Sequence, residues 1–218
     1  MSCPQCIGIE QVFDDIEARA ELDRFLRKGP RKTTRLLIEG VKEAGVAGRT
    51  LLDIGGGVGA VQLGLLAAGA KRAVDVDASS ALLRTAHQEA EKRGVADRIT
   101  YRFGNFVEMA EELPPADVVT LDRVICCYHD VESLLAHAAR HATSALGMVS
   151  PRDLPRGRFM NRLINLGRRL RGSPFRSFIH HRSRIEELLS SCGLERSFYR
   201  RTFFWQVEVF RRASPAGT

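Results

Sequence analysis

The stretch Leu51-Leu52-Asp53-Ile54-Gly55-Gly56-Gly57-Val58-Gly59-Ala60 decides the fold of this chain. Its mostly apolar beginning predicts a short buried β-strand, and its glycines predict a tight turn into a helix that begins at Val58. Glycine tolerates positive φ and lets bare N–H groups approach a ligand, and the N-terminal end of the helix adds partial positive charge at the same place. The stretch therefore predicts a cradle for a nucleotide-like cofactor at the C-terminal end of a first strand.

Strands and helices alternate from this stretch onward. Runs of apolar residues predict strands at 50–54, 72–76, 99–103, 116–121 and 146–150. Apolar residues at helical spacing predict helices at 58–68, from a cap at Ser79 or Ser80 to Gly94, and at 131–142. Such alternation is typical of an α/β fold with a doubly wound parallel sheet.

The residues before the first strand are expected to be helical. One helix spans 10–28 and ends at Gly29-Pro30, and Thr33 or Thr34 caps a second helix. Residues 1–48 are therefore expected to form a helical N-terminal lid.

The alternation stops after the fifth strand. An amphipathic helix is marked by apolar residues at helical spacing, which are Phe159, Leu163, Leu166 and Leu170. Ser183 and Glu186 form a capping box for a further helix. Residues 194–201 and 202–212 predict two strands that pair antiparallel through a tight turn. We expect one domain, with a cofactor-binding core at 49–150, a helical insert that lines the substrate pocket at 151–193, and a terminal strand pair at 194–212.

The charge of the chain is compatible with several partners. Its net charge is +7, and much of the excess lies between Arg152 and Arg184. Such a cluster can meet phosphate or carboxylate groups of a substrate, or nucleic acid, or it can form only a solvated face. No apolar run reaches the roughly 18 residues that span a bilayer, and no secretory signal is visible. We therefore expect a cytoplasmic protein with no membrane span and leave the oligomeric state open.

The five cysteines predict thiols rather than disulfides. Cys3 and Cys6 are half of a zinc site, but no second C-x-x-C motif exists. Cys126 and Cys127 can complete a four-thiolate site only if two neighbouring residues bind one tetrahedral ion, which is rare. We therefore expect no metal, two frayed thiols at the N-terminus, and two packed ones at 126 and 127.

Two cofactors are compatible with the glycine loop alone. Gly55-x-Gly57-x-x-Ala60, with an acidic residue about 20 positions further on, satisfies the dinucleotide fingerprint and is compatible with NAD. However, Asp53-x-Gly55-x-Gly57-x-Gly59 resembles the first signature of class I S-adenosylmethionine-dependent methyltransferases. Ala73-Val74-Asp75-Val76-Asp77-Ala78-Ser79 is similar to the second strand of that family.

The resemblance implies a Rossmann-like, seven-stranded, mostly parallel sheet with a C-terminal antiparallel pair, and S-adenosylmethionine as cofactor. It implies that Asp77, rather than Asp75, binds the ribose hydroxyls, and that Asp53 lies near the methionine end. Asn105 and Phe106 match the position near the adenine, where the family usually has an acid. The cofactor-binding residues expected on this basis are Asp53, Gly55, Gly57, Gly59, Asp77, Ala78, Asn105, Phe106 and Asp122.

The segment after the fourth strand, 122–130, is expected to pass beneath the transferred methyl group. His129 is the expected general base and Tyr128 a second catalytic candidate, although either can equally be structural. Further candidates for the substrate pocket are Arg123, Arg152, Asn161 and His180.

The order of motifs resembles small-molecule O-methyltransferases, distantly including those that act on magnesium-protoporphyrin carboxylates. We therefore expect methyl transfer to a small, possibly anionic acceptor, with oxygen as the acceptor atom. The absence of an Asn/Asp-Pro-Pro-Tyr sequence argues against nucleobase amines. Alternatives are an RNA methyltransferase that uses 152–184, a thiol or metalloid methyltransferase that uses Cys126 and Cys127, an NAD-dependent oxidoreductase, and a scaffold without enzymatic activity.

Overall fold

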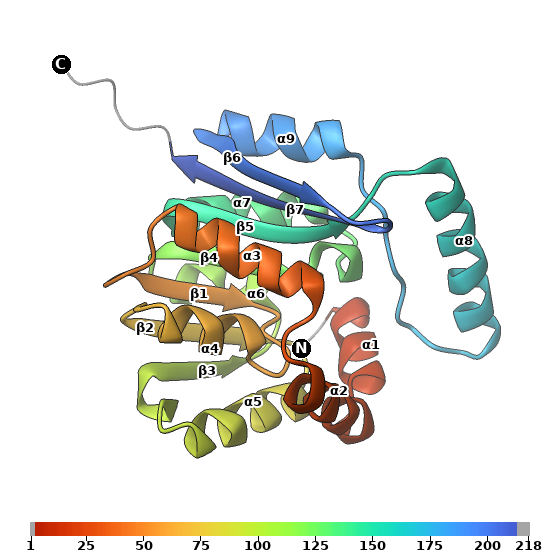
Figure 1. Cartoon of the computed structure of the whole chain (residues 1–218). Coiled ribbons are helices and arrows are strands. Elements are labelled where there is room, and N and C mark those ends of the chain that lie inside the picture. The colour runs from red at the N-terminus through yellow and green to blue at the C-terminus, as the bar shows by residue number, and fades with distance from the viewer. Residues whose placement is uncertain (1–2, 213–218) are drawn as a thin grey trace.

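One seven-stranded sheet forms the centre of the computed structural model, which describes residues 3–212 (Figure 1). Its strands are β1 (Thr50–Ile54), β2 (Arg72–Asp77), β3 (Ile99–Phe103), β4 (Ala116–Asp122), β5 (Ala142–Pro151), β6 (Leu194–Arg201) and β7 (Trp205–Arg212). Their order is β3-β2-β1-β4-β5-β7-β6, with parallel pairing from β3 to β5 and antiparallel pairing of β7 with both β5 and β6. The predicted α/β fold, with its antiparallel C-terminal pair, is confirmed.

Helices cover both faces of the sheet. One face packs against α3 (Lys32–Glu43), α4 (Ala60–Ala67) and α5 (Ser80–Lys92). The other packs against α6 (Phe106–Met109), α7 (Val131–His141) and α9 (Arg182–Ser191). Because side chains alternate along a strand, Leu51 joins the first core and Leu52 the second. Short 3₁₀ turns connect some of these elements: η1 (Ala96–Arg98), η2 (Ala110–Glu112) and η3 (Ile125–Cys127).

The N-terminal region contains two helices where the sequence predicts one. These are α1 (Pro4–Val12) and α2 (Asp15–Lys28). The prediction of a single helix was wrong because the Asp14 carboxylate accepts hydrogen bonds from the amides of Ile16 and Glu17, which begins a new helix. The following helix, α3, has no side-chain cap, and Thr33 and Thr34 are buried within it instead of capping it.

Three other boundaries differ from the predictions. The first crossover helix begins at Ala60 rather than Val58, because Gly59 adopts a left-handed conformation. The fifth strand begins at Ala142, directly after α7. The expected capping box does not form, since α9 begins after His181 and Ser183 already lies inside the helix.

The helix α8 (Pro155–Leu170) differs from the others, because none of its residues is buried. Figure 1 shows it apart from the sheet, joined to the rest of the chain by extended segments. Between residues 3 and 212, no helix is long and apolar enough to cross a membrane.

Candidate active site

A cavity of about 400 Å³ lies at the C-terminal ends of the parallel strands. Its walls include Gly55–Gly57 after β1, Asp77 and Ala78 after β2, 104–106 after β3, and 122–124 after β4. The strand order reverses at β1, since β2 and β4 lie on its two sides. Doubly wound sheets bind ligands at such a switch point.

The glycine loop closes one side of this cavity. Gly55 and Gly57 have φ values of +66° and +60°. A Cβ atom on Gly55 would lie 2.5 Å from Val124 Cγ2, and one on Gly56 would lie 2.5 Å from Asp75 Oδ1. The loop therefore needs glycine both for its backbone conformation and for the close approach of its neighbours.

Asp77 is the acidic residue that β2 presents to the cavity. Its carboxylate accepts hydrogen bonds from the backbone amides of Ser79 (2.8 Å) and Gly57 (3.1 Å). Burial raises the pKa of Asp77 to about 6, although the backbone amides act in the opposite direction. Asp75 does not line the cavity and is completely buried. This arrangement favours Asp77 over Asp75 as the group that faces a ligand.

Asp53 lies beneath the glycine loop and does not line the cavity. Its Oδ1 accepts a hydrogen bond from Thr120 Oγ1 at 2.6 Å, and within 3–212 its Oδ2 has no hydrogen-bond partner. Burial raises the pKa of Asp53 to about 7. Its carboxyl group thus reaches a ligand only indirectly, through the loop above it.

Asn105 connects two loops of the cavity. Its Oδ1 accepts a hydrogen bond from the Val107 amide at the start of α6, and its Nδ2 donates to the Tyr128 hydroxyl (both 3.2 Å). Phe106 is buried beside it and also lines the cavity. The amide of Asn105 therefore fixes the position of Tyr128.

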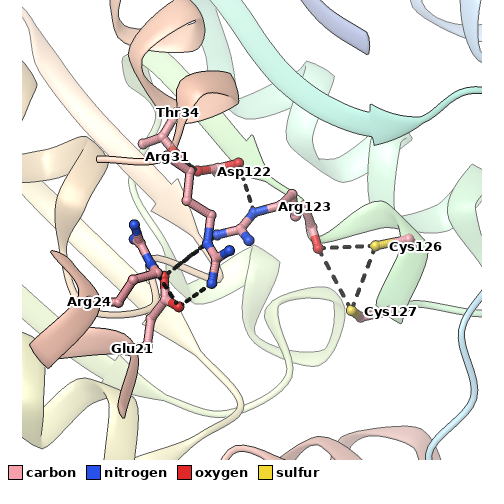
Figure 2. A network of polar contacts seen from close by, with 8 residues as sticks. All are labelled: Glu21, Arg24, Arg31, Thr34, Asp122, Arg123, Cys126 and Cys127. Carbon is pink, nitrogen blue, oxygen red and sulfur yellow. Dashed lines mark hydrogen bonds and ion pairs between the residues drawn. The ribbon is translucent and has the colours of Figure 1, made fainter. Parts of the chain in front are cut away.

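The loop after β4 contains a strained residue. Arg123 has a φ of +63° and is the only non-glycine residue with positive φ in the part of the chain that is described. The left-handed conformation costs roughly 1–2 kcal/mol for a residue with a Cβ atom. Arg123 Nε lies 3.4 Å from Asp122 Oδ1, while Thr34 Oγ1 donates to Asp122 Oδ2 at 2.5 Å (Figure 2).

Polar side chains from the N-terminal helices meet this loop. Glu21 accepts hydrogen bonds from Arg24 and Arg31, and its Oε1 lies 4.0 Å from Arg123 Nη2 (Figure 2). Burial acts to raise the pKa of Glu21, but the hydrogen bonds from Arg31 and Arg24 outweigh it and lower that pKa. The lid and the β4 loop are thus joined by a network with more guanidinium groups than carboxylates.

Cys126 and Cys127 form a pair of thiols in the wall of the cavity. Their Sγ atoms are 3.8 Å apart, and Cys126 Sγ donates to the Arg123 carbonyl oxygen at 3.2 Å. Hydrogen bonding with Cys127 and burial raise the pKa of Cys126, whereas the hydrogen bond from Cys126, with Arg168 and Arg123 nearby, lowers the pKa of Cys127. Cys6 is buried and lines the cavity too, so the prediction of a frayed thiol there was wrong.

Tyr128 lies in the cavity wall, but the structure does not bring His129 there. Tyr128 has an extended backbone, so successive side chains point to opposite sides. Tyr128 takes the buried side and His129 is exposed. The prediction of a histidine base at this place is therefore not supported by the geometry.

Three candidates from the helical insert have other partners. Arg152 donates to the carbonyl oxygens of Thr202 and Phe203, and Asn161 Nδ2 donates to the Ser177 carbonyl oxygen. His180 Nε2 lies 2.9 Å and 3.1 Å from the carbonyl oxygens of Ile125 and Tyr128, so it holds the β4 loop. None of these three residues is among those that line the cavity.

Several residues of the cavity wall were not foreseen. They are Glu21, Arg24, Arg31 and Thr34 from the N-terminal helices, with Arg168, Phe175, Ser177 and Trp205 from the C-terminal third. The sequence predicted a lid and an insert as whole segments. No local pattern in it indicated which of their side chains face the cavity.

Comparison with known proteins shows which proteins this chain is similar to. Residues 51–144 match the family model described as "Methyltransferase domain". The ribosomal protein L11 methyltransferase of Mannheimia succiniciproducens is 35% identical over 96 residues, which are 43% of this chain and 33% of that protein. The chain thus matches about a third of the length of that curated relative.

Solved structures of similar fold cover nearly the whole chain. Magnesium protoporphyrin IX methyltransferase from Synechocystis, with bound SAH, has a TM-score of 0.69 at 18% identity and covers 94% of this chain and 98% of that one. The mitomycin 7-O-methyltransferase has a TM-score of 0.65 at 23% identity and covers 94% of this chain and 60% of that one. At these identities the likeness shows the fold.

The fold is that of the class I S-adenosylmethionine-dependent methyltransferases. Residues 51–144 match the methyltransferase-domain family model, in agreement with the resemblance drawn from the glycine loop and β2.

The cavity fits S-adenosylmethionine as its cofactor. Asp77 offers one buried carboxylate at the end of β2, and Gly57 has open space where a Cβ atom would lie. No group of three or more His, Cys, Asp or Glu side chains that could hold a metal ion is present among residues 3–212.

Proposed function

We propose that this protein transfers a methyl group from S-adenosylmethionine to a carboxylate oxygen of a small molecule. The observation that carries this proposal is that one cavity combines two kinds of lining residue. Gly55–Gly57 and Asp77, which suit the cofactor, line the same cavity as Arg123 and Arg168. Within the described residues neither guanidinium donates a hydrogen bond to a carboxylate, and Arg123 has only the longer ion pairs with Asp122 (3.4 Å) and Glu21 (4.0 Å).

The two arginines suit an anionic acceptor. Arg168 donates to Ser177 Oγ at 3.0 Å and lies over the Phe175 ring at 4.6 Å, which fixes its guanidinium and leaves other donors unused. Guanidinium groups bind carboxylates through paired N–H donors. We therefore assign Arg123 and Arg168 to binding the acidic group of the acceptor.

The titratable residues of the cavity favour an acceptor that is already ionised. Bound S-adenosylmethionine supplies a methyl group on a positively charged sulfur, which the acceptor atom displaces. A hydroxyl or ammonium acceptor needs a general base, but the described lining contains no histidine, and burial raises the pKa of Tyr128. The carboxylates of the lining other than the exposed Glu17 already accept hydrogen bonds, namely Glu21, Asp77 and Asp122. A carboxylate needs no base, so the residues have only to align it and exclude water.

In this proposal Asp77 binds the ribose hydroxyls, and Asp53 supports the glycine loop from below. Asn105 positions Tyr128, whose hydroxyl borders the reaction site. The lid residues Phe13 and Glu21 cover the cavity. The net effect is a mostly apolar site in which opposite charges attract more strongly than in water.

The chemical lability of the product tests the proposed acceptor. The protein is incubated with methyl-labelled S-adenosylmethionine and the small-molecule fraction of a bacterial extract, and the product is then treated with base. A carboxyl methyl ester releases volatile labelled methanol, whereas ethers, methylated amines and methylated carbon retain the label. Release that is lost in Arg123→Gln supports the proposal, and a base-stable label contradicts it.

Thiol or metalloid methylation stays a second candidate because Cys126 and Cys127 do line the cavity, 3.8 Å apart. Trivalent metalloids bind such thiol pairs. Turnover that survives Cys126→Ser with Cys127→Ser would remove this candidate.

The RNA alternative has less support. Arg158, Arg182 and Arg184 form ion pairs with Asp153, Glu186 and Glu132, so part of the 152–184 cluster is already neutralised. A steep loss of binding with salt, together with copurified RNA, would favour this alternative.

A further inference from the structure

The apolar stripe of α8 faces away from the protein. Four residues one or two turns apart form this stripe: Phe159, Leu163, Leu166 and Leu170. Their exposed fractions are 61%, 47%, 53% and 79%. A surface helix of a globular protein normally packs such a stripe against the core. Here the orientation is inverted, and Figure 1 shows α8 standing clear of the sheet.

The polar side of α8 explains this orientation. Asn161 Nδ2 and Asn165 Nδ2 donate to the Ser177 carbonyl oxygen at 2.8 Å and 2.7 Å, and the Ser177 amide donates to Asn165 Oδ1 at 2.9 Å. Arg168 adds a hydrogen bond to Ser177 Oγ. The segment after α8 thus holds the helix by its polar face, which leaves the apolar face without a partner among residues 3–212.

Positive charge surrounds the stripe. From Leu154 to Ile185 the sequence contains nine arginines and no acidic residue. Three of them, Arg158, Arg182 and Arg184, form ion pairs with carboxylates outside this range. By helical spacing, Arg162 and Arg169 flank the stripe on one side and Arg156 flanks it on the other. Long arginine stems allow the charged groups to stay at a polar boundary while the apolar residues enter a less polar one.

Two exposed aromatic residues extend the patch. Phe203 and Phe204, in the turn between β6 and β7, are 60% and 65% exposed. The Arg156 guanidinium lies 4.6 Å from the centroid of the Phe203 ring, so this turn adjoins the first turn of α8. We call these residues together the α8 patch: the four stripe residues, the flanking Arg156, Arg162 and Arg169, and the aromatic pair Phe203 and Phe204.

We propose that the α8 patch binds the surface of a membrane that contains anionic lipids. The stripe residues enter the boundary between headgroups and acyl chains, and the flanking arginines contact lipid phosphates. A basic amphipathic helix that lies in the plane of the membrane behaves in this way without crossing it. The polar face of α8 borders the cavity, because Arg168 and its partners Phe175 and Ser177 line it. Docking of the opposite, apolar face therefore brings this side of the cavity close to the membrane.

Charge favours lipid over a second copy of this chain. Two α8 patches packed against each other would bring their arginines together, and the patch supplies no carboxylate to neutralise them. Lipid phosphates supply that negative charge. The proposal goes beyond methyl transfer and does not depend on it, because binding to vesicles is measured without cofactor or acceptor.

Cosedimentation with vesicles tests this proposal. The full chain is mixed with vesicles of phosphatidylcholine alone or of phosphatidylcholine with phosphatidylglycerol. We expect binding to the anionic vesicles at least tenfold tighter than to the neutral ones, and a decrease in that binding at high salt.

Two matched double variants identify the surface. Leu163→Gln with Leu166→Gln should weaken binding to anionic vesicles at least tenfold, because both side chains are exposed parts of the stripe. Ile16→Gln with Leu26→Gln removes two exposed apolar side chains of α2 and should leave binding unchanged. Titration with S-adenosylhomocysteine shows that both variants remain folded.

Three results would overturn the proposal. They are no binding of the parent protein to anionic vesicles, unchanged binding of the Leu163→Gln, Leu166→Gln variant, and a concentration-dependent dimer that this variant dissociates. The last result would assign the patch to a second copy of the chain.

Discussion

At the scale of single residues, three carboxyl groups lie buried beneath the glycine loop without a cation beside them. Asp53, Asp75 and Asp77 form no ion pair within the described part of the chain, and burial raises the pKa of each. Only Asp77 reaches the cavity. The sequence offers all three at suitable spacing, and only their position relative to the cavity distinguishes the ligand-facing Asp77 from the other two.

The assignment of the ribose to Asp77 is testable by cofactor affinity. Asp77→Ala should weaken binding of S-adenosylmethionine at least tenfold, which corresponds to about 1.4 kcal/mol for lost charge-assisted hydrogen bonds. Isothermal titration calorimetry measures this change, with Asp75→Asn as control, since Asp75 does not line the cavity. Equal affinity of Asp77→Ala and the parent would show that the ribose binds elsewhere. Saturable binding of NADH but not of S-adenosylmethionine would instead indicate an oxidoreductase.

The pKa of Asp53 predicts how stability depends on pH. The pKa rises from 3.8 to about 7 on folding. Between these pH values the folded state holds a proton that the unfolded state has lost, so this group lowers stability as the pH rises from about 4 to about 7. The asparagine of Asp53→Asn does not titrate. The free energy of unfolding of this variant, relative to the parent, should therefore increase by about 1.4 kcal/mol at most for each pH unit in this window and level off above it.

Denaturant titrations of both proteins at pH 5, 6, 7 and 8 measure this difference. Asp117→Asn is the control, because hydrogen bonds from the backbone amide and side chain of Thr50, with Arg49 nearby, lower the pKa of Asp117. Its effect on stability should not change between pH 5 and 8. A pH-independent effect of Asp53→Asn would show that Asp53 is already ionised in the folded protein.

At the scale of elements, α1, α2 and α8 have positions that composition does not determine. The break between α1 and α2 depends on the Asp14 side chain, and it turns α2 so that Glu21 meets Arg123. The direction of α8 depends on Ser177, a residue outside the helix.

The role of Asp14 is testable by stability. Asp14→Ala should destabilise the protein by about 1 kcal/mol, because two amides at the start of α2 lose their acceptor. Asp15→Ala is the matched control. It removes an exposed ion pair with Arg84, for which we expect less than about 0.5 kcal/mol. Equal effects in chemical denaturation would mean that α2 does not depend on this cap.

At the scale of the whole molecule, the cavity joins segments that are far apart in the sequence. Phe13 and Glu21 belong to the N-terminal helices, the loops after β1, β2 and β4 form the floor, and Arg168 and Trp205 come from the C-terminal third. Ligand binding should therefore stabilise all three regions together.

Hydrogen exchange measures this coupling. With saturating S-adenosylhomocysteine, exchange should slow in 9–31 as well as in 55–60 and 104–107, because residues of all three segments border the cavity. Exchange in residues 63–67 of α4 and 86–92 of α5, none of which lines the cavity, should change less. Protection confined to the glycine loop would show that the N-terminal helices do not act as a lid.

Most of the fold was predictable because its signals are local. Apolar runs, glycines and the caps at Ser79 and Asp130 set the strands and helices from residue 50 to 141, and the bounds of β3 agree with the prediction. The errors lie where a side chain competes with helical periodicity, as at Asp14, or where a helix passes directly into a strand, as at Ala142.

The sequence alone therefore determined the fold and indicated the cofactor, because the glycine loop, Asp53 and Asp77 lie within one β-α-β unit and their spacing is sufficient for the resemblance. Only the tertiary structure decided which distant side chains complete the site. The sequence favoured His129 over Tyr128 as the catalytic residue, whereas burial places Tyr128 in the cavity wall and leaves His129 exposed, and Glu21 met Arg123 only through the packing of α2. The stripe of α8 was equally visible in the sequence. Whether such a stripe faces the core or the solvent depends on contacts that helical periodicity does not encode.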